Sequence, residues 1–194
     1  MLAFYGVILF VFAFVKYFQK VLTYFILISI LSFQLIYAFE FYQVYKQNKF
    51  YILHQSRTTV LAEKSGYQLK VYTKDTIKIQ ELKFLENFKT ELAIKDLKKL
   101  PQKNFYGINE TENLLVIDSL GVYKIPKNTK ADYILLSNSP KINLDRVLES
   151  LKPQQIIVDG SNYFSYVKRW KETCIKKKIP FHFTGKKGAF IIDY

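Results

Sequence analysis

The first 39 residues contain only two charged side chains, Lys16 and Lys20, and all sixteen Asp and Glu residues lie at Glu40 or beyond. Two apolar runs make up this part, at residues 2–18 and 21–41. About 20 apolar residues in a helix cross the hydrocarbon core of a bilayer, and the backbone of a spanning segment must satisfy its own hydrogen bonds. The sequence therefore predicts a membrane hairpin of two transmembrane helices, residues 2–18 and 21–41.

A cleaved signal peptide is the alternative for this segment. It would need a positive region ahead of the apolar run, whereas the first lysine is Lys16. The connector at residues 16–20 is so short that the two helices must be antiparallel. Its two lysines favour the cytoplasmic side, which places the rest of the chain outside the inner membrane. Lys46, Lys49 and Arg57 oppose this orientation.

The remainder divides into a linker, residues 42–49, and a strongly basic part, residues 50–194. Beyond Phe39 the chain carries 27 Lys and Arg residues against 16 Asp and Glu residues, a net charge of +11. Such a charge favours phosphate backbones or anionic lipid head groups as partners. The competing explanation is compositional drift in a Lys-rich sequence, without any binding function.

Hydropathy patterns in the basic part predict an α/β domain, a mixed sheet layered with helices. Predicted helices cover residues 81–100, 144–151 and 163–178. Predicted strands cover residues 50–54, 58–62, 68–73, 76–79, 105–108, 113–117, 122–125, 133–136, 155–159, 180–183 and 189–193.

Residues able to support catalysis or metal binding are scarce. The only histidines are His54 and His182, and the only cysteine is Cys174. A catalytic metal needs about three protein ligands, and no Gly-rich phosphate loop is present. Asp118 and Asp159 each end an apolar run, where a carboxylate commonly turns the chain. The sequence therefore predicts no catalytic residues, no metal, no cofactor and no small-molecule substrate.

The helix predicted at residues 163–178 has two unlike faces. Tyr163, Tyr166, Val167, Trp170 and Cys174 follow helical spacing and should pack inwards. The other face is basic, and two further lysines, Lys186 and Lys187, lie in the turn between the last two predicted strands. A solvated surface is the simple explanation, and a phosphate-binding ridge is the functional one. The candidate phosphate contacts are Lys168, Arg169, Lys171, Lys176, Lys177, Lys178, Lys186 and Lys187.

The stretch from Asp132 to Ile192 resembles the C-terminal end of the ComEC family of competence channels, in its Bacteroidetes-type version. Residues 114–123 (LLVIDSLGVY) and 54–57 (HQSR) are similar to landmarks of the same family. Many members end in a metallo-β-lactamase-like domain, which implies the same layout here without its ligands. Residues 137–140 (SNSP) replace the family's His-His-Gly-Ser, Phe164-Ser165 fall where His-Pro is expected, and the His-x-His-x-Asp-His motif has no counterpart.

The resemblance implies a non-catalytic, membrane-anchored tail of a DNA-uptake channel in the inner membrane. Its partners would be the channel core, the lipid bilayer and single-stranded DNA, held through phosphate contacts and base stacking. A structural or protein-docking domain that stabilises the channel without binding DNA is the alternative. An active nuclease is a third possibility, which the histidine count disfavours.

Overall fold

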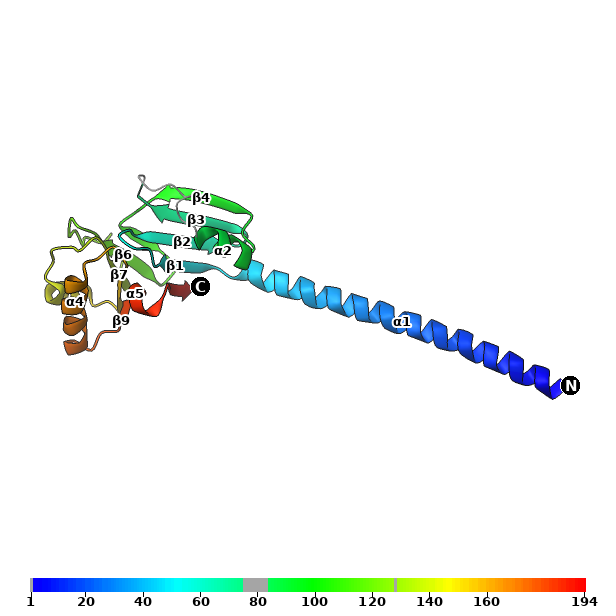
Figure 1. The fold of residues 1–194 in the computed structure, drawn as a ribbon. Coiled ribbons are helices and arrows are strands. Elements are labelled where there is room, and N and C mark those ends of the chain that lie inside the picture. Colours follow the sequence, from blue (N-terminus) through cyan, green and yellow to red (C-terminus); the bar gives the residue numbers. More distant parts are fainter. Residues whose placement is uncertain (1, 75–83, 128) are drawn as a thin grey trace. The chain divides into compact units, whose positions relative to one another are not determined.

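The computed structural model describes residues 2–74, 84–127 and 129–194. The chain separates into two units, which divide between Val44 and Tyr45. The first unit is helical and the second is an α/β domain with two sheets (Figure 1). The prediction of an α/β domain with mixed sheets behind an apolar segment is confirmed.

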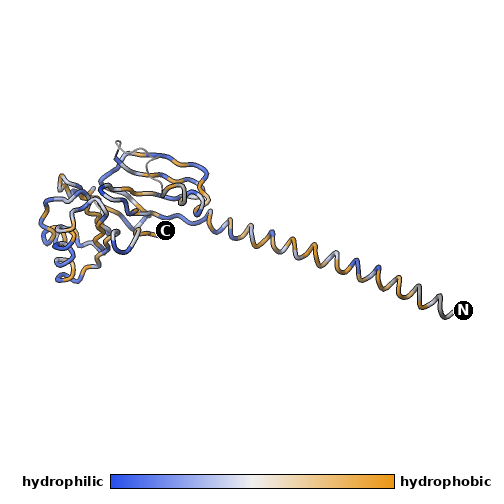
Figure 2. The backbone as a smooth tube through the Cα atoms, in the orientation of Figure 1, coloured by the Kyte–Doolittle hydropathy of each residue, from blue (hydrophilic) through white to orange (hydrophobic). Residues whose placement is uncertain are grey.

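One continuous helix, α1 (Leu2–Lys46), replaces the predicted hairpin. Apolar residues recur along its whole length (Figure 2). The expected chain reversal at residues 16–20 is not present, because the Lys-Tyr-Phe-Gln-Lys connector contains no Gly or Pro and each of its residues can continue a helix. The helix also takes up most of the predicted linker, and strand β1 begins at Lys49.

Five strands form the first sheet of the domain: β1 (Lys49–Leu53), β2 (Val60–Ser65), β3 (Gln68–Thr73), β4 (Asp96–Pro101) and β10 (Phe190–Asp193). Their order is β10-β1-β2-β3-β4, antiparallel except for the parallel pair β3–β4. The C-terminal strand therefore pairs with the first strand of the domain, which ties the two ends of this unit together.

The second sheet has the order β5-β6-β7-β8-β9. Only β5–β6 is antiparallel, and β6 through β9 run parallel. Helices connect β7 to β8 and β8 to β9, because a parallel pair needs a crossover connection rather than a tight turn. Its elements are β5 (Phe105–Gly107), β6 (Asn113–Ile117), β7 (Tyr133–Leu136), α3 (Leu144–Leu151), β8 (Gln155–Val158), α4 (Phe164–Lys176) and β9 (Phe181–Phe183).

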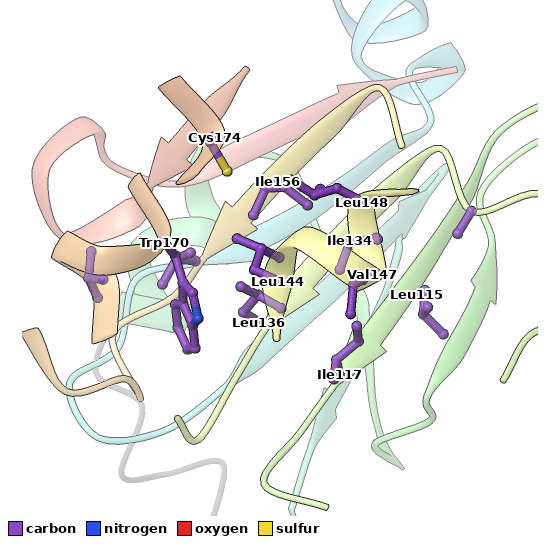
Figure 3. Packing of buried hydrophobic residues seen from close by; sticks show 13 residues of the cluster. Leu115, Ile117, Ile134, Leu136, Leu144, Val147, Leu148, Ile156, Trp170 and Cys174 are labelled. Atoms are coloured by element: carbon purple, nitrogen blue, oxygen red, sulfur yellow. The ribbon is translucent and has the colours of Figure 1, made fainter. Parts of the chain in front are cut away.

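The domain has four layers, with α3 and α4 over the second sheet, then the first sheet, then α2, and an apolar cluster lies between each pair of neighbouring layers. Alternate side chains of β6 point to opposite faces: Leu114 and Val116 pack between the two sheets, while Leu115 and Ile117 pack under α3 and α4. Figure 3 shows this outer cluster, with Trp170 and Cys174 of α4 directed at the sheet. The third cluster joins the far face of the first sheet to helix α2 (Phe84–Glu91).

The predicted helix at residues 81–100 is wrong in its second half. Helix α2 ends at Glu91, Ala93 adopts a positive φ of 52°, and β4 follows. The apolar residues Leu92, Ile94 and Leu97 still face the same core cluster as α2. A helix–turn–strand thus buries the residues whose spacing resembled one helix, because parallel pairing with β3 outweighs the local pattern.

Two smaller expectations also differ from the structure. Residues 122–125 form no strand, and Val122 and Tyr123 are exposed there. Tyr163 is 73% exposed rather than packed inwards, since it is the residue before α4 and lies outside the helical stripe. A short helix not predicted from sequence, α5 (Thr184–Lys187), connects β9 to β10. The strand predicted at residues 76–79 lies outside the described residues.

Candidate nucleic-acid interface

The parallel strands β6 to β9 end at one edge of the second sheet, the usual position of a ligand site in an open α/β sheet. The turns that follow β7 and β8 are bound to each other there. The Asn138 amide donates to Ser161 Oγ at 2.7 Å, and the Ser139 amide donates to Asn162 Oδ1 at 2.8 Å. These bonds hold Asn138 and Ser139 in left-handed conformations, φ 54° and 52°, which are costly for non-glycine residues.

Asp159 is the buried centre of this polar cluster, with no exposed surface. Its Oδ1 accepts hydrogen bonds from the amide and hydroxyl of Ser161 and from the side-chain amide of Asn162. Its Oδ2 is buried and has no hydrogen-bond partner among the residues that the structure describes. Burial raises the pKa of Asp159, and the hydrogen bonds from Ser161 oppose that rise.

His54 contacts the same edge from the first sheet, with Nδ1 3.1 Å from the Thr184 hydroxyl. Gly160 permits this approach, because a Cβ there would lie 2.5 Å from the carbonyl oxygen of Gln55. His182 lies in β9, where its Nε2 donates to the carbonyl oxygen of Gly188 at 3.0 Å. Among the described residues, no three His, Cys, Asp or Glu side chains are grouped closely enough to hold a metal ion.

The two strand-ending carboxylates have local structural roles, as predicted. Asp118 Oδ1 accepts the Leu120 amide at 3.0 Å, which closes the loop after β6. Asp159 closes the turn after β8 in the same way through the Ser161 amide. Asn162 adds a bond to the carbonyl oxygen of Leu136 at 2.7 Å. This edge of the sheet is therefore a network whose polar groups mostly satisfy one another.

The basic candidates gather instead at a groove between α4, β9 and α5. The groove holds a cavity of about 370 Å³. Four of the eight predicted phosphate contacts line it: Lys168 and Lys171 from α4, and Lys186 and Lys187 from α5. Residues from two separate helices thus place four exposed ammonium groups around one opening, an arrangement suited to anions.

The other four candidates lie apart from this groove. Arg169 stacks its guanidinium over the Tyr166 ring, 4.7 Å from the ring centre. Lys177 pairs with Glu149 at 2.9 Å and with Asp145 at 4.0 Å. Lys176 ends α4, and Lys178 follows it with a positive φ of 56°. The predicted ridge is therefore divided between the groove and the C-terminal end of the helix.

The floor of the groove was not predicted from the sequence. Phe164, Val167 and Ile175 of α4 and Ile179, Phe181 and Phe183 beyond it supply apolar walls. Phe164 is 63% exposed and Ile175 is 64% exposed. The spacing 164, 168, 171, 175 describes a second helical stripe that mixes Phe, Lys and Ile. This mixed stripe is the sequence feature that indicates the groove. It is neither purely apolar nor purely basic, so the division of α4 into an apolar and a basic face does not reveal it.

Comparison with known families identifies this domain. The family model of the ComEC C-terminal domain matches residues 50–194, which comprise both sheets and all of the groove. No curated protein and no solved structure matches the chain. The match starts within β1 and extends over three quarters of the sequence. The chain therefore belongs to the ComEC family, as a C-terminal part of a protein of that family.

Proposed function

We propose that this chain is the membrane-anchored C-terminal part of a competence DNA-uptake channel and that its groove contacts single-stranded DNA without cutting it. Family membership supports the role in DNA uptake. The observation that carries the DNA contact is the convergence of Lys168, Lys171, Lys186 and Lys187 on one groove. Phosphate neutralisation by lysine supplies most of the affinity of nonspecific nucleic-acid binding.

Membrane anchoring is proposed for helix α1. Among the described residues, one helical segment, Phe10–Lys46, is long and apolar enough to cross a bilayer. At 1.5 Å per residue the 45-residue helix is about 68 Å long, roughly twice the thickness of the hydrocarbon core. Residues 21–39 provide an uncharged stretch of spanning length, with Lys16 and Lys20 on its N-terminal side.

A non-catalytic role agrees with the polar edge of the second sheet. The four layers, helix–sheet–sheet–helix, support the proposed relation to a metallo-β-lactamase-like domain. At the edge where the resemblance implies metal ligands, residues 137–140 and 159–163 form hydrogen bonds with each other. We infer that this edge is a structural clamp and that the basic groove carries the DNA contact.

A charge-matched pair of triple variants tests the DNA contact. The groove variant is Lys168→Gln/Lys171→Gln/Lys186→Gln, and the control is Lys176→Gln/Lys177→Gln/Lys178→Gln. The full chain in neutral detergent is titrated with fluorescent oligothymidylate at several salt concentrations. Losing three contacts should flatten the log–log salt slope by about 2 in the groove variant, since each phosphate on a single strand contributes about 0.7.

The control removes the same charge at a place where Lys177 is already paired with Glu149. Its slope should stay close to that of the parent protein. Equal slopes for the parent and the groove variant would overturn the DNA contact at the groove.

Protein docking is the second candidate function, and one feature favours it. The loop after β6 exposes apolar side chains, with Leu120 77% exposed and Val122 47% exposed. The Asp118 carboxylate and carbonyl hold this loop in shape through the Leu120 and Gly121 amides. If the groove variants leave DNA binding unchanged, this loop becomes the stronger candidate for contact with the channel core.

A further inference from the structure

Phosphate binding alone does not explain the floor of the groove. A surface that holds only a phosphate backbone needs cations and polar donors, yet Phe164, Phe181 and Phe183 line this one. Exposed apolar surface on a soluble domain costs free energy and commonly marks a binding site. The groove thus pairs an apolar, aromatic floor with a cationic rim.

The rim and the floor are interleaved residue by residue. Along α4 the groove is lined by Phe164, Lys168, Lys171 and Ile175, each about one helical turn from the next. The opposite wall repeats the combination, with Phe183 of β9 followed by Lys186 and Lys187 of α5. Both walls of the groove therefore offer a ligand aromatic or aliphatic side chains together with lysines.

Three local features shape the aromatic floor. Lys186 Nζ lies 5.9 Å from the centre of the Phe164 ring, which brings the two walls together at the opening. Gly185 leaves space for the Phe183 ring, since a Cβ on residue 185 would lie 2.5 Å from the tip of that ring. The Lys187 ammonium donates to the carbonyl oxygen of Phe181 at 3.3 Å, which steadies the second wall.

We propose that this groove is a nucleobase-binding site, which takes an unstacked base of a single strand on Phe164 and Phe183 and the adjoining phosphates on the four lysines. The inference rests on the proposed DNA contact and deepens it. A nucleotide is a flat aromatic ring joined to an anion, which is the combination that the floor and the rim present. A duplex keeps its bases paired and stacked, so it offers only its phosphates.

The test separates the base from the phosphate. The full chain in neutral detergent is titrated with a fluorescent 12-mer of thymidylate and with a 12-mer whose inner positions are abasic. The two strands carry the same phosphates. The thymidylate strand should bind about tenfold more tightly, because stacking on aromatic side chains contributes on that scale.

Phe164→Ala and Tyr163→Ala form the matched pair of variants. Both side chains are aromatic, adjacent in sequence and largely exposed, so neither truncation threatens the fold. Phe164 lines the groove and Tyr163 does not. Phe164→Ala should reduce the preference for thymidylate over the abasic strand severalfold, and Tyr163→Ala should keep it.

Three results would overturn the base site. Equal binding of the two strands, with the lysine-dependent salt slope retained, would refute the base site and leave the DNA contact standing. If neither the parent protein nor the lysine variants bind either strand, both the base site and the DNA contact are refuted. Phe164-dependent binding to vesicles of anionic phospholipid, without any preference for bases, would assign the groove to a lipid.

Discussion

The hydroxyl of Ser161 donates a hydrogen bond to the buried carboxylate of Asp159 and accepts one from the Asn138 amide. One side chain thereby joins the turn after β8 to the turn after β7. The hydroxyl of Thr59, the residue before β2, donates to the same hydroxyl at 3.3 Å. The edge of the second sheet is thus fastened to the first sheet through Ser161.

This relationship predicts a pH dependence of stability. Burial raises the pKa of Asp159 above its usual 3.8 in the folded state, so the folded protein binds that proton more tightly than the unfolded chain does. The contribution of Asp159 to the free energy of unfolding therefore falls as the pH rises through the window above 3.8, by about 1.4 kcal/mol for each pKa unit of difference.

Asp159→Asn keeps the Oδ1 acceptor and removes the ionisation. We expect the variant to gain stability relative to the parent as the pH rises from about 4 to about 8, and to lose that advantage at the acid end. Urea unfolding of both proteins across this range measures the difference. Parallel stability curves would show that Asp159 titrates normally.

Trp170 is the central side chain of the cluster under α3 and α4 and is 2% exposed. Trp170→Ala should lower the free energy of unfolding by about 3–5 kcal/mol, as truncation of a large core residue usually does. Tyr163→Ala, at the residue before α4, is the control. It should lower the free energy of unfolding by under about 0.5 kcal/mol because the Tyr163 ring is exposed. Chemical denaturation followed by circular dichroism compares the two.

The strands of the second sheet could be predicted well from sequence, and the reason is burial. Strands β6, β7 and β8 are short apolar runs buried on both faces, bounded by polar residues that end them. Helix α3 also begins and ends where predicted, since Asn143 caps it and Pro153 follows it. At these places the local pattern and the tertiary environment agree.

The groove and β4 could not be predicted, because both depend on partners distant in sequence. β4 is a strand only through its parallel pairing with β3. The groove needs α5, a four-residue helix at Thr184–Lys187 that carries no sequence signal of its own. Trp170 is buried, as its helical spacing predicts, whereas Phe164, the residue proposed for base stacking, is exposed.

Metal content offers a third prediction. His54 contacts Thr184 and His182 contacts Gly188, so each histidine is engaged in a structural contact at a different element. Protein purified without chelator should contain well under one equivalent of zinc or manganese by elemental analysis, and added zinc should not raise its melting temperature. One equivalent of bound metal per chain would contradict this prediction and reopen a hydrolytic function.

Membrane orientation is the last prediction, and it follows from the charges that flank residues 21–39. Lys16 and Lys20 precede this apolar stretch, and positive residues near a span favour the cytoplasm, so the basic domain should face outwards.

Lys103 is exposed and its side chain is outside the groove, so Lys103→Cys reports on the domain. An impermeant maleimide should label it in intact spheroplasts. The native Cys174 is buried and should stay unlabelled until the protein is denatured. An epitope at the N-terminus then tests α1 as a single span: it should lie inside, on the side opposite the domain, and an epitope found outside would contradict that arrangement. Labelling of Lys103→Cys only after lysis would place the domain in the cytoplasm and give the decisive weight to Lys46 and Lys49.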